Sequence, residues 1–132
     1  MFKQNLILSL CLLLTSLVSL NASAEPVDQQ AIEKYVEMDL AVKQATLDGI
    51  KERVILMHLQ ATSADDLAHD ASIQKEVSSI YRHYNTNAGK AVHWAGQHKK
   101  AIQHWLEQHP EFQQRYEDMA AELIKLSAQL PE

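Results

Sequence analysis

Apolar residues at alternating spacings of three and four, in a chain almost without glycine and proline, constrain this sequence most. The clearest run follows Pro110 and comprises Phe112, Tyr116, Met119, Leu123, Leu126 and Leu130. An earlier run follows Asp28 and comprises Ile32, Val36, Leu40, Leu47, Ile50, Val54, Met57 and Ala61. Such spacing places the apolar side chains on one face of an α-helix. Only three glycines and three prolines interrupt the chain, so we predict an all-α protein.

The middle of the chain predicts at least one more helix and a break. Ser63 with Asp66 three residues later resembles a capping box and indicates a helix start. Residues 85–89 read Asn-Thr-Asn-Ala-Gly, and these residue types mostly disfavour helix interiors. Short turns between three or four helices predict an antiparallel up-and-down bundle. If residues 85–89 stay helical, the alternative is an elongated three-helix coiled-coil hairpin.

The first 24 residues have the three parts of an export signal. Lys3 gives a short positive start, residues 6–20 are an apolar run, and Ala22-Ser23-Ala24 is a small-residue cleavage site. The apolar run is shorter than the roughly 20 residues that a membrane-spanning helix needs. We therefore predict a signal peptide over 1–24, cleaved between Ala24 and Glu25. The product is a single helical domain over 25–132, periplasmic or secreted, without a membrane span.

Cleavage also changes the chemistry that the chain can perform. Cys11 is the only cysteine, so the remaining chain has no thiol for catalysis, disulfides or thiolate metal ligands. The glycines are too scattered for a phosphate-binding loop. No strand-turn context positions a Ser, His and Asp set, and no paired inward carboxylates are evident. We predict that the protein is not an enzyme.

Charge is distributed unevenly along the chain. The net charge is −5 at pH 7 and becomes −6 when Lys3 leaves with the signal, yet residues 77–106 contain no carboxylate. This stretch holds a tandem repeat, His-Trp-Ala-Gly-Gln-His from His93 and His-Trp-Leu-Glu-Gln-His from His104. An offset of 11 residues is about three helical turns, so the two copies would share a face of one helix. Equivalent histidines would stand about 16 Å apart, too far for one metal ion.

Two interpretations of this stretch remain open. A basic helix can complement acidic neighbours inside one bundle, with both tryptophans in the core or in a homodimer contact. Alternatively, the stretch is a docking surface for a protein or an anionic envelope surface. The partner-binding residues would then be Arg82, Lys90, His93, Trp94, Lys99, Lys100, His104 and Trp105. Four Lys and Arg residues are too few to indicate nucleic-acid binding.

Two cofactor alternatives follow from the histidines. In an antiparallel hairpin, His58 would approach Asp66, His69 and Asp70, which share one face after the turn at 62–63. Two imidazoles and two carboxylates suit a divalent transition metal such as zinc, nickel, cobalt or copper. Against this, acidic residues also stabilise a helix N-terminus without any metal. Haem held between His58 and His98 is the second alternative, which no motif selects.

The combined observations predict a small exported helical binding or accessory protein of the cell envelope. An adaptor, an inhibitor or a stress-response factor would fit, with the basic His/Trp-containing helix contacting the partner. One alternative function is a periplasmic metal-binding sensor or buffer that uses the His and Asp ligands of the hairpin. Another is a non-covalent carrier of haem or an apolar ligand.

Overall fold

The computed structural model describes residues 26–60 and 62–130 and is helical throughout, with short connections. Its elements are α2 (Gln29–His58), α3 (Ser63–His83), α4 (Ala88–Gln97), α5 (Lys99–Gln108) and α6 (Pro110–Ser127). The prediction of an all-α helical bundle is confirmed. The described chain has more helices than the three or four expected, because residues 64–108 are interrupted twice. The predicted signal peptide, residues 1–24, lies outside the described residues.

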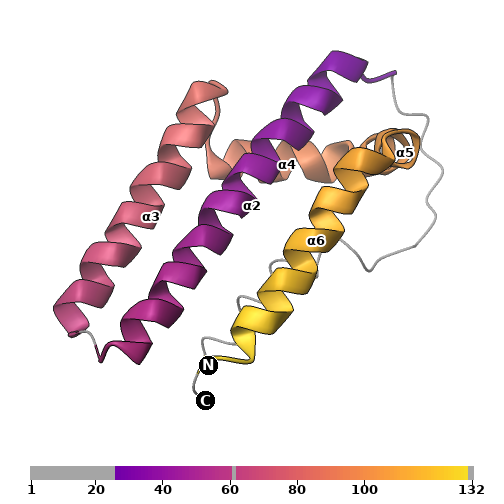
Figure 1. Cartoon of the computed structure of the whole chain (residues 1–132). Helices are drawn as coiled ribbons and strands as arrows, with labels where there is room; N and C mark the ends of the chain where they lie inside the picture. Colours follow the sequence, from indigo (N-terminus) through magenta and orange to yellow (C-terminus); the bar gives the residue numbers. More distant parts are fainter. Residues whose placement is uncertain (1–25, 61, 131–132) are drawn as a thin grey trace.

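Helix α2 is the central element of the bundle. It packs against α3 on one side and α6 on the other, while α4 passes behind α2 and α5 is viewed nearly along its axis (Figure 1). Arg53 pairs with Asp70, and Gly49, earlier in α2, meets Ile73, later in α3, so α3 runs antiparallel to α2. Asp39 meets Tyr116, and Lys51 meets Glu122 further along both helices, so α6 runs parallel to α2. Helices α2 and α3 therefore keep the up-and-down order. Helices α4 and α5 then carry the chain behind α2 to the start of α6 (Figure 1).

The break expected in residues 85–89 is confirmed, and two asparagines make it. Asn85 adopts a left-handed backbone (φ 56°), and its N–H donates to the Arg82 carbonyl at 3.0 Å. The next N–H, of Thr86, donates to the Tyr81 carbonyl at 3.0 Å, which completes a Schellman-type helix end. Asn87 then caps α4 by accepting from the Lys90 N–H. The elongated hairpin alternative needs an unbroken helix here and is not formed.

The start of α3 lies one residue earlier than the sequence pattern suggested. Thr62, not Ser63, is the N-cap, and its partner is Asp65 rather than Asp66. The Asp65 carboxylate accepts from the Thr62 hydroxyl at 2.6 Å and from the Thr62 N–H at 2.9 Å. These hydrogen bonds lower the pKa of Asp65, with the hydroxyl the larger cause. The predicted capping box is thus present in a shifted register.

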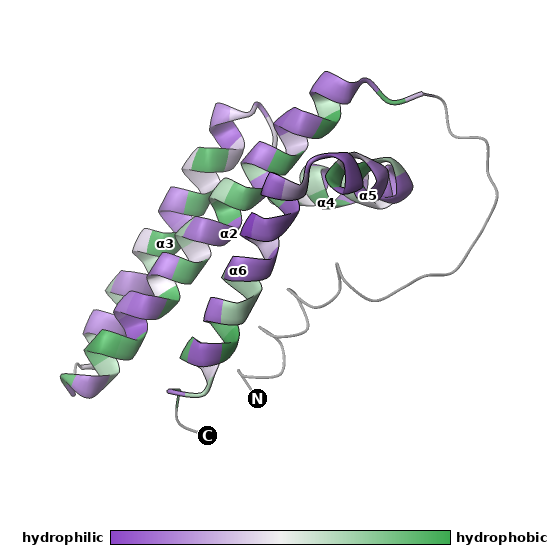
Figure 2. Cartoon of the chain, turned by 45° about the vertical axis from the view of Figure 1, so that its right-hand side comes forward, coloured by the Kyte–Doolittle hydropathy of each residue, from purple (hydrophilic) through white to green (hydrophobic). Residues whose placement is uncertain are grey.

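The hydrophobic core lies between α2, α5 and α6. Its buried cluster comprises Ile32, Val36, Leu40, Leu47, Trp105, Met119 and Leu123. Hydrophobic and hydrophilic residues alternate along α2, α3 and α6, as expected of helices with one apolar stripe (Figure 2). Helix α3 contributes no fully buried residue. It approaches α2 closely at Gly49, where an added Cβ would lie 2.6 Å from Ile73 Cγ1, so a larger residue there would require the Ile73 side chain to move.

Candidate functional site

The tandem repeat forms two similar helix ends. Trp94 packs on His98 with ring centroids 4.3 Å apart, and Trp105 stacks on His109 at 3.8 Å. Each of these histidines is the C-cap of its helix, and its Nδ1–H donates to the carbonyl of its own tryptophan at 2.7 Å. The Trp94 carbonyl also accepts the His98 backbone N–H at 3.1 Å, whereas the His109 N–H donates to the Leu106 carbonyl instead of that of Trp105. The repeat therefore marks two helix terminations.

The expectation that the repeat lies on one continuous helix is wrong. Helix α4 ends at Gln97 and α5 begins at Lys99, with His98 between them in a non-helical backbone conformation (φ −113°, ψ 16°). We call residues 88–108 the α4–α5 elbow. Because α4 and α5 do not form one regular helix, the 11-residue offset no longer fixes the relative directions of the two copies.

Both tryptophans of the elbow point into the protein. Trp105 is only 4% exposed, and its ring lies 5.1 Å from that of Phe112. Trp94 is half-buried, with its ring centroid 5.2 Å from that of Tyr35 on α2. Of the residues predicted to bind a partner, Trp105 is thus placed in the core and Trp94 against α2. Their contacts hold the elbow to the long helices.

The remaining six predicted residues all have exposed side chains, and we call this set the basic face. They are Arg82, Lys90, His93, Lys99, Lys100 and His104. Val92 is 71% exposed beside His93, so the surface also offers an apolar contact. The nearest carboxylate that follows in sequence is Glu107, whose Oε2 lies 3.6 Å from His104 Nδ1. The basic face is therefore positively biased on a chain whose net charge is −5.

A polar cluster that the sequence did not reveal lies between the long helices. The Lys43 ammonium contacts both oxygens of Asp39 at 2.7 and 2.8 Å, and the side chains of the pair are only 15% exposed. Tyr116 of α6 donates its hydroxyl to Asp39 at 2.8 Å. Burial raises the pKa of Tyr35, Tyr81 and Tyr116, and the nearby Asp39 carboxylate adds to each shift. The phenols therefore stay neutral and able to donate hydrogen bonds.

Three of the four proposed metal ligands have other side-chain contacts. His58 Nδ1–H donates to the Val54 carbonyl at 2.7 Å, and Asp70 pairs with Arg53. His69 Nε2–H donates to the Gly49 carbonyl at 2.7 Å, while its Nδ1 faces Glu52 at 3.3 Å. Asp66 lies in the first turn of α3, where its charge suits the helix N-terminus. Within residues 26–60 and 62–130, no three His, Cys, Asp or Glu side chains are grouped to hold a metal.

The two histidines of the haem alternative lie near opposite ends of α2. His58 is the last residue of α2, whereas His98 lies against Trp94, which packs on Tyr35 near the start of that helix. The 23 residues between Tyr35 and His58 span roughly 35 Å of helix. The two imidazoles are therefore not positioned to ligate one iron.

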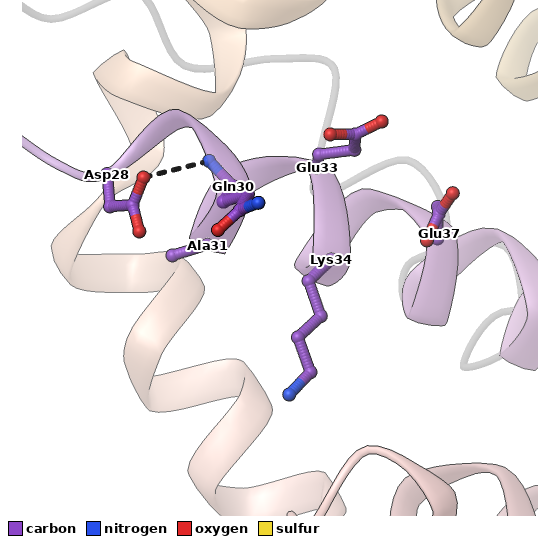
Figure 3. Close-up of a pocket in the computed structure, with 6 residues that line it drawn as sticks. All are labelled: Asp28, Gln30, Ala31, Glu33, Lys34 and Glu37. Carbon is purple, nitrogen blue, oxygen red and sulfur yellow. Dashed lines mark hydrogen bonds between the residues drawn. The ribbon is translucent and has the colours of Figure 1, made fainter.

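Two shallow surface hollows lie in the described part of the chain. The first, of about 430 Å³, lies along the start of α2 and is lined by consecutive turns of that one helix (Figure 3). Asp28 there caps the helix by accepting from the Gln30 N–H at 3.1 Å, so its role is structural. The second, of about 670 Å³, runs along α3 to the start of α4. Neither is an enclosed chamber for a haem or a fatty acyl chain.

Comparison with known proteins adds no identity to this geometry. No family model matches the chain, and no curated protein or solved structure is significantly similar to it. Among the described residues, moreover, no helix is long and apolar enough to cross a membrane.

Proposed function

We propose that this chain is a small exported binding protein of the cell envelope, and that its basic face docks on an acidic surface of a partner protein. The proposal includes export by the segment 1–24 and the absence of catalysis. The observation that carries it is the contrast between the two sides of the α4–α5 elbow. The tryptophans face inward, whereas Lys90, His93 and His104 face outward in a stretch free of carboxylates.

Two physical features support a docking role over a purely internal one. Arg82, Lys90 and His93 have exposed side chains, so their charges are accessible to a partner protein. The aromatic contacts beneath the elbow also fix its shape before binding, which reduces the entropy lost on association. Exposed charges of this kind mainly steer encounter and select partners of opposite sign. The neighbouring exposed Val92 adds apolar area that favours a protein surface.

The test combines site-specific crosslinking with charge reversal in the cells that make the protein. A diazirine amino acid in place of His93 should yield a defined adduct with another protein. Reversal of Lys90, Lys99 and Lys100 to Glu should lower that yield about tenfold, since each exposed charge pair contributes roughly 0.5 kcal/mol. Lys34→Glu, at an exposed position on α2, is the matched control. An adduct that persists unchanged in the triple variant would refute the proposal.

A further inference from the structure

Helix α3 (Ser63–His83) lies at the edge of the bundle and outside its hydrophobic core (Figure 1). The buried cluster is formed by α2, α5 and α6, and the half-buried apolar residues that pack on it come from residues 27–50 and from α4, α5 and α6. In the described part of the chain, no residue of α3 belongs to either group. The apolar residues of α3, such as Ile73 and Val77, are at most half-buried. Departure of α3 from α2 would therefore leave the core cluster assembled.

Helix α3 is attached to α2 by an apolar contact and by polar links. The Ile73 side chain packs directly on Gly49 of α2. The Nε2–H of His69 donates to the Gly49 carbonyl at 2.7 Å, and the side chain of His69 is only 8% exposed. Arg53 pairs with Asp70 at 3.2 Å, but these side chains are 35% and 41% exposed, and an ion pair so accessible to water stabilises little. Of these two polar links, the one from His69 is therefore the stronger.

A residue with a left-handed backbone lies in the turn at each end of α3. Gln60 precedes the helix with φ 55°, and Asn85 follows it with φ 56°. This conformation is unfavourable for a residue with a Cβ, so opening of either turn would release strain. The two turns also separate the backbone hydrogen bonds of α3 from those of α2 and α4. Helices in proteins owe most of their stability to tertiary packing, so α3 would lose its helical hydrogen bonds on leaving α2.

We infer that α3 is a detachable strap, which leaves α2 and unfolds locally as one cooperative unit while α2, α5 and α6 stay packed. Elements with few buried apolar contacts open at a lower free energy than the core of the same protein. The turns at Gln60 and Asn85 set the limits of this unit. The hydrogen bond from His69 to Gly49 and the packing of Ile73 hold it closed.

Opening of the strap changes the surface proposed to bind a partner. Arg82 lies in the last turn of α3, whereas the other members of the basic face belong to α4 and α5. Detachment of α3 therefore separates Arg82 from the rest of the basic face, and only the attached strap presents the complete set. This regulatory consequence rests on the proposed docking function, whereas the strap itself does not.

Amide hydrogen exchange of the purified exported protein, read by mass spectrometry under native conditions, tests the strap directly. Amides of residues 66–81 should exchange together, at least tenfold faster than those of residues 36–47 in α2 and 112–123 in α6. Equal exchange in all three segments would overturn the inference, because α3 would then open only when the whole chain unfolds. The measurement needs no partner, so its failure is distinct from an absence of adducts at His93, which would refute the docking function.

Two variants test the attachment at Gly49. His69→Phe keeps a ring of similar helix propensity but removes the donor, so exchange in α3 should become about fivefold faster while that of α6 stays unchanged. Gly49→Ala displaces Ile73 and should also speed exchange in α3, although alanine favours the helical state of α2.

Lys75→Gln is the matched control, because Lys75 is exposed on α3 and the two residues have similar helix propensities. It should change exchange in α3 less than twofold. Acceleration of α3 and α6 by the same factor in His69→Phe and Gly49→Ala would overturn the inference. Unchanged exchange of α3 in both variants would overturn it as well, because these contacts would then not hold the strap closed.

Discussion

At the scale of single residues, backbone conformation and local hydrogen bonds explain most of the polar positions. Three of the seven histidines, His58, His98 and His109, donate Nδ1–H to a carbonyl four residues earlier at a helix end. His69 instead links α3 to the Gly49 carbonyl of α2. The number of histidines suggested metal binding in the sequence, but these four histidines have structural roles in helix ends and in the α2–α3 contact.

Gln60 gives the first prediction, at the residue scale. It follows the end of α2 with a left-handed backbone (φ 55°), a conformation that costs a side chain with a Cβ about 1 kcal/mol. Gln60→Gly should therefore stabilise the protein by about 0.5–1 kcal/mol, measured by urea unfolding. Asn85→Gly at the equivalent position after α3 is the control and should gain less, because asparagine tolerates this conformation. Equal stability of Gln60→Gly and wild type would contradict the interpretation.

At the scale of elements, apolar stripes and capping residues decide where each helix begins and ends. The apolar stripe after Pro110 and the one after Asp28 both became core helices, with Val36 and Met119 among the buried residues. Their period requires only local geometry, so the sequence was sufficient to predict them. The end of α4 at His98 was missed because residues 91–105 contain no proline and only one glycine, Gly96.

The paired helix ends of the elbow give the second prediction. His98→Ala and His109→Ala each remove one hydrogen bond to a carbonyl and one ring contact with a tryptophan. Each should destabilise the protein by about 1–2 kcal/mol in thermal unfolding. His93→Ala, exposed on α4, should change stability by less than about 0.5 kcal/mol. Three variants of equal stability would show that the histidines do not cap these helices.

At the scale of the whole molecule, the Asp39 cluster joins helices that are far apart in the chain. Tyr116 lies 77 residues from Asp39, and Lys43 places its ammonium 5.7 Å from the centre of the Tyr116 ring. Charged groups with so little exposure are stable only when their hydrogen bonds are satisfied, and no buried side-chain polar atom in the described part of the chain lacks a partner. The cluster therefore helps to specify the parallel pairing of α2 and α6.

Alkaline titration tests this cluster. The pKa values of Tyr35, Tyr81 and Tyr116 are raised in the folded protein, first by burial and then by the charge of Asp39. Their neutral forms contribute stability that is fully present below about pH 10, the unfolded value, and is lost as the pH rises above it. Phenolate absorbance of these tyrosines should therefore appear together with loss of helical circular dichroism. Complete phenol ionisation near pH 10 with the helical signal intact would contradict the burial of the cluster.

The sequence by itself determined the all-α class, the core stripes and the break near Asn87, because these depend on residues within a few turns of one another. Only the tertiary structure decided that α6 runs parallel to α2, that Asp39 meets Tyr116 and that Trp94 packs on Tyr35. It also placed both tryptophans against the long helices and left Lys90, His93 and His104 exposed. These features arise from contacts between distant segments, and periodicity along the chain carries no information about which segments meet.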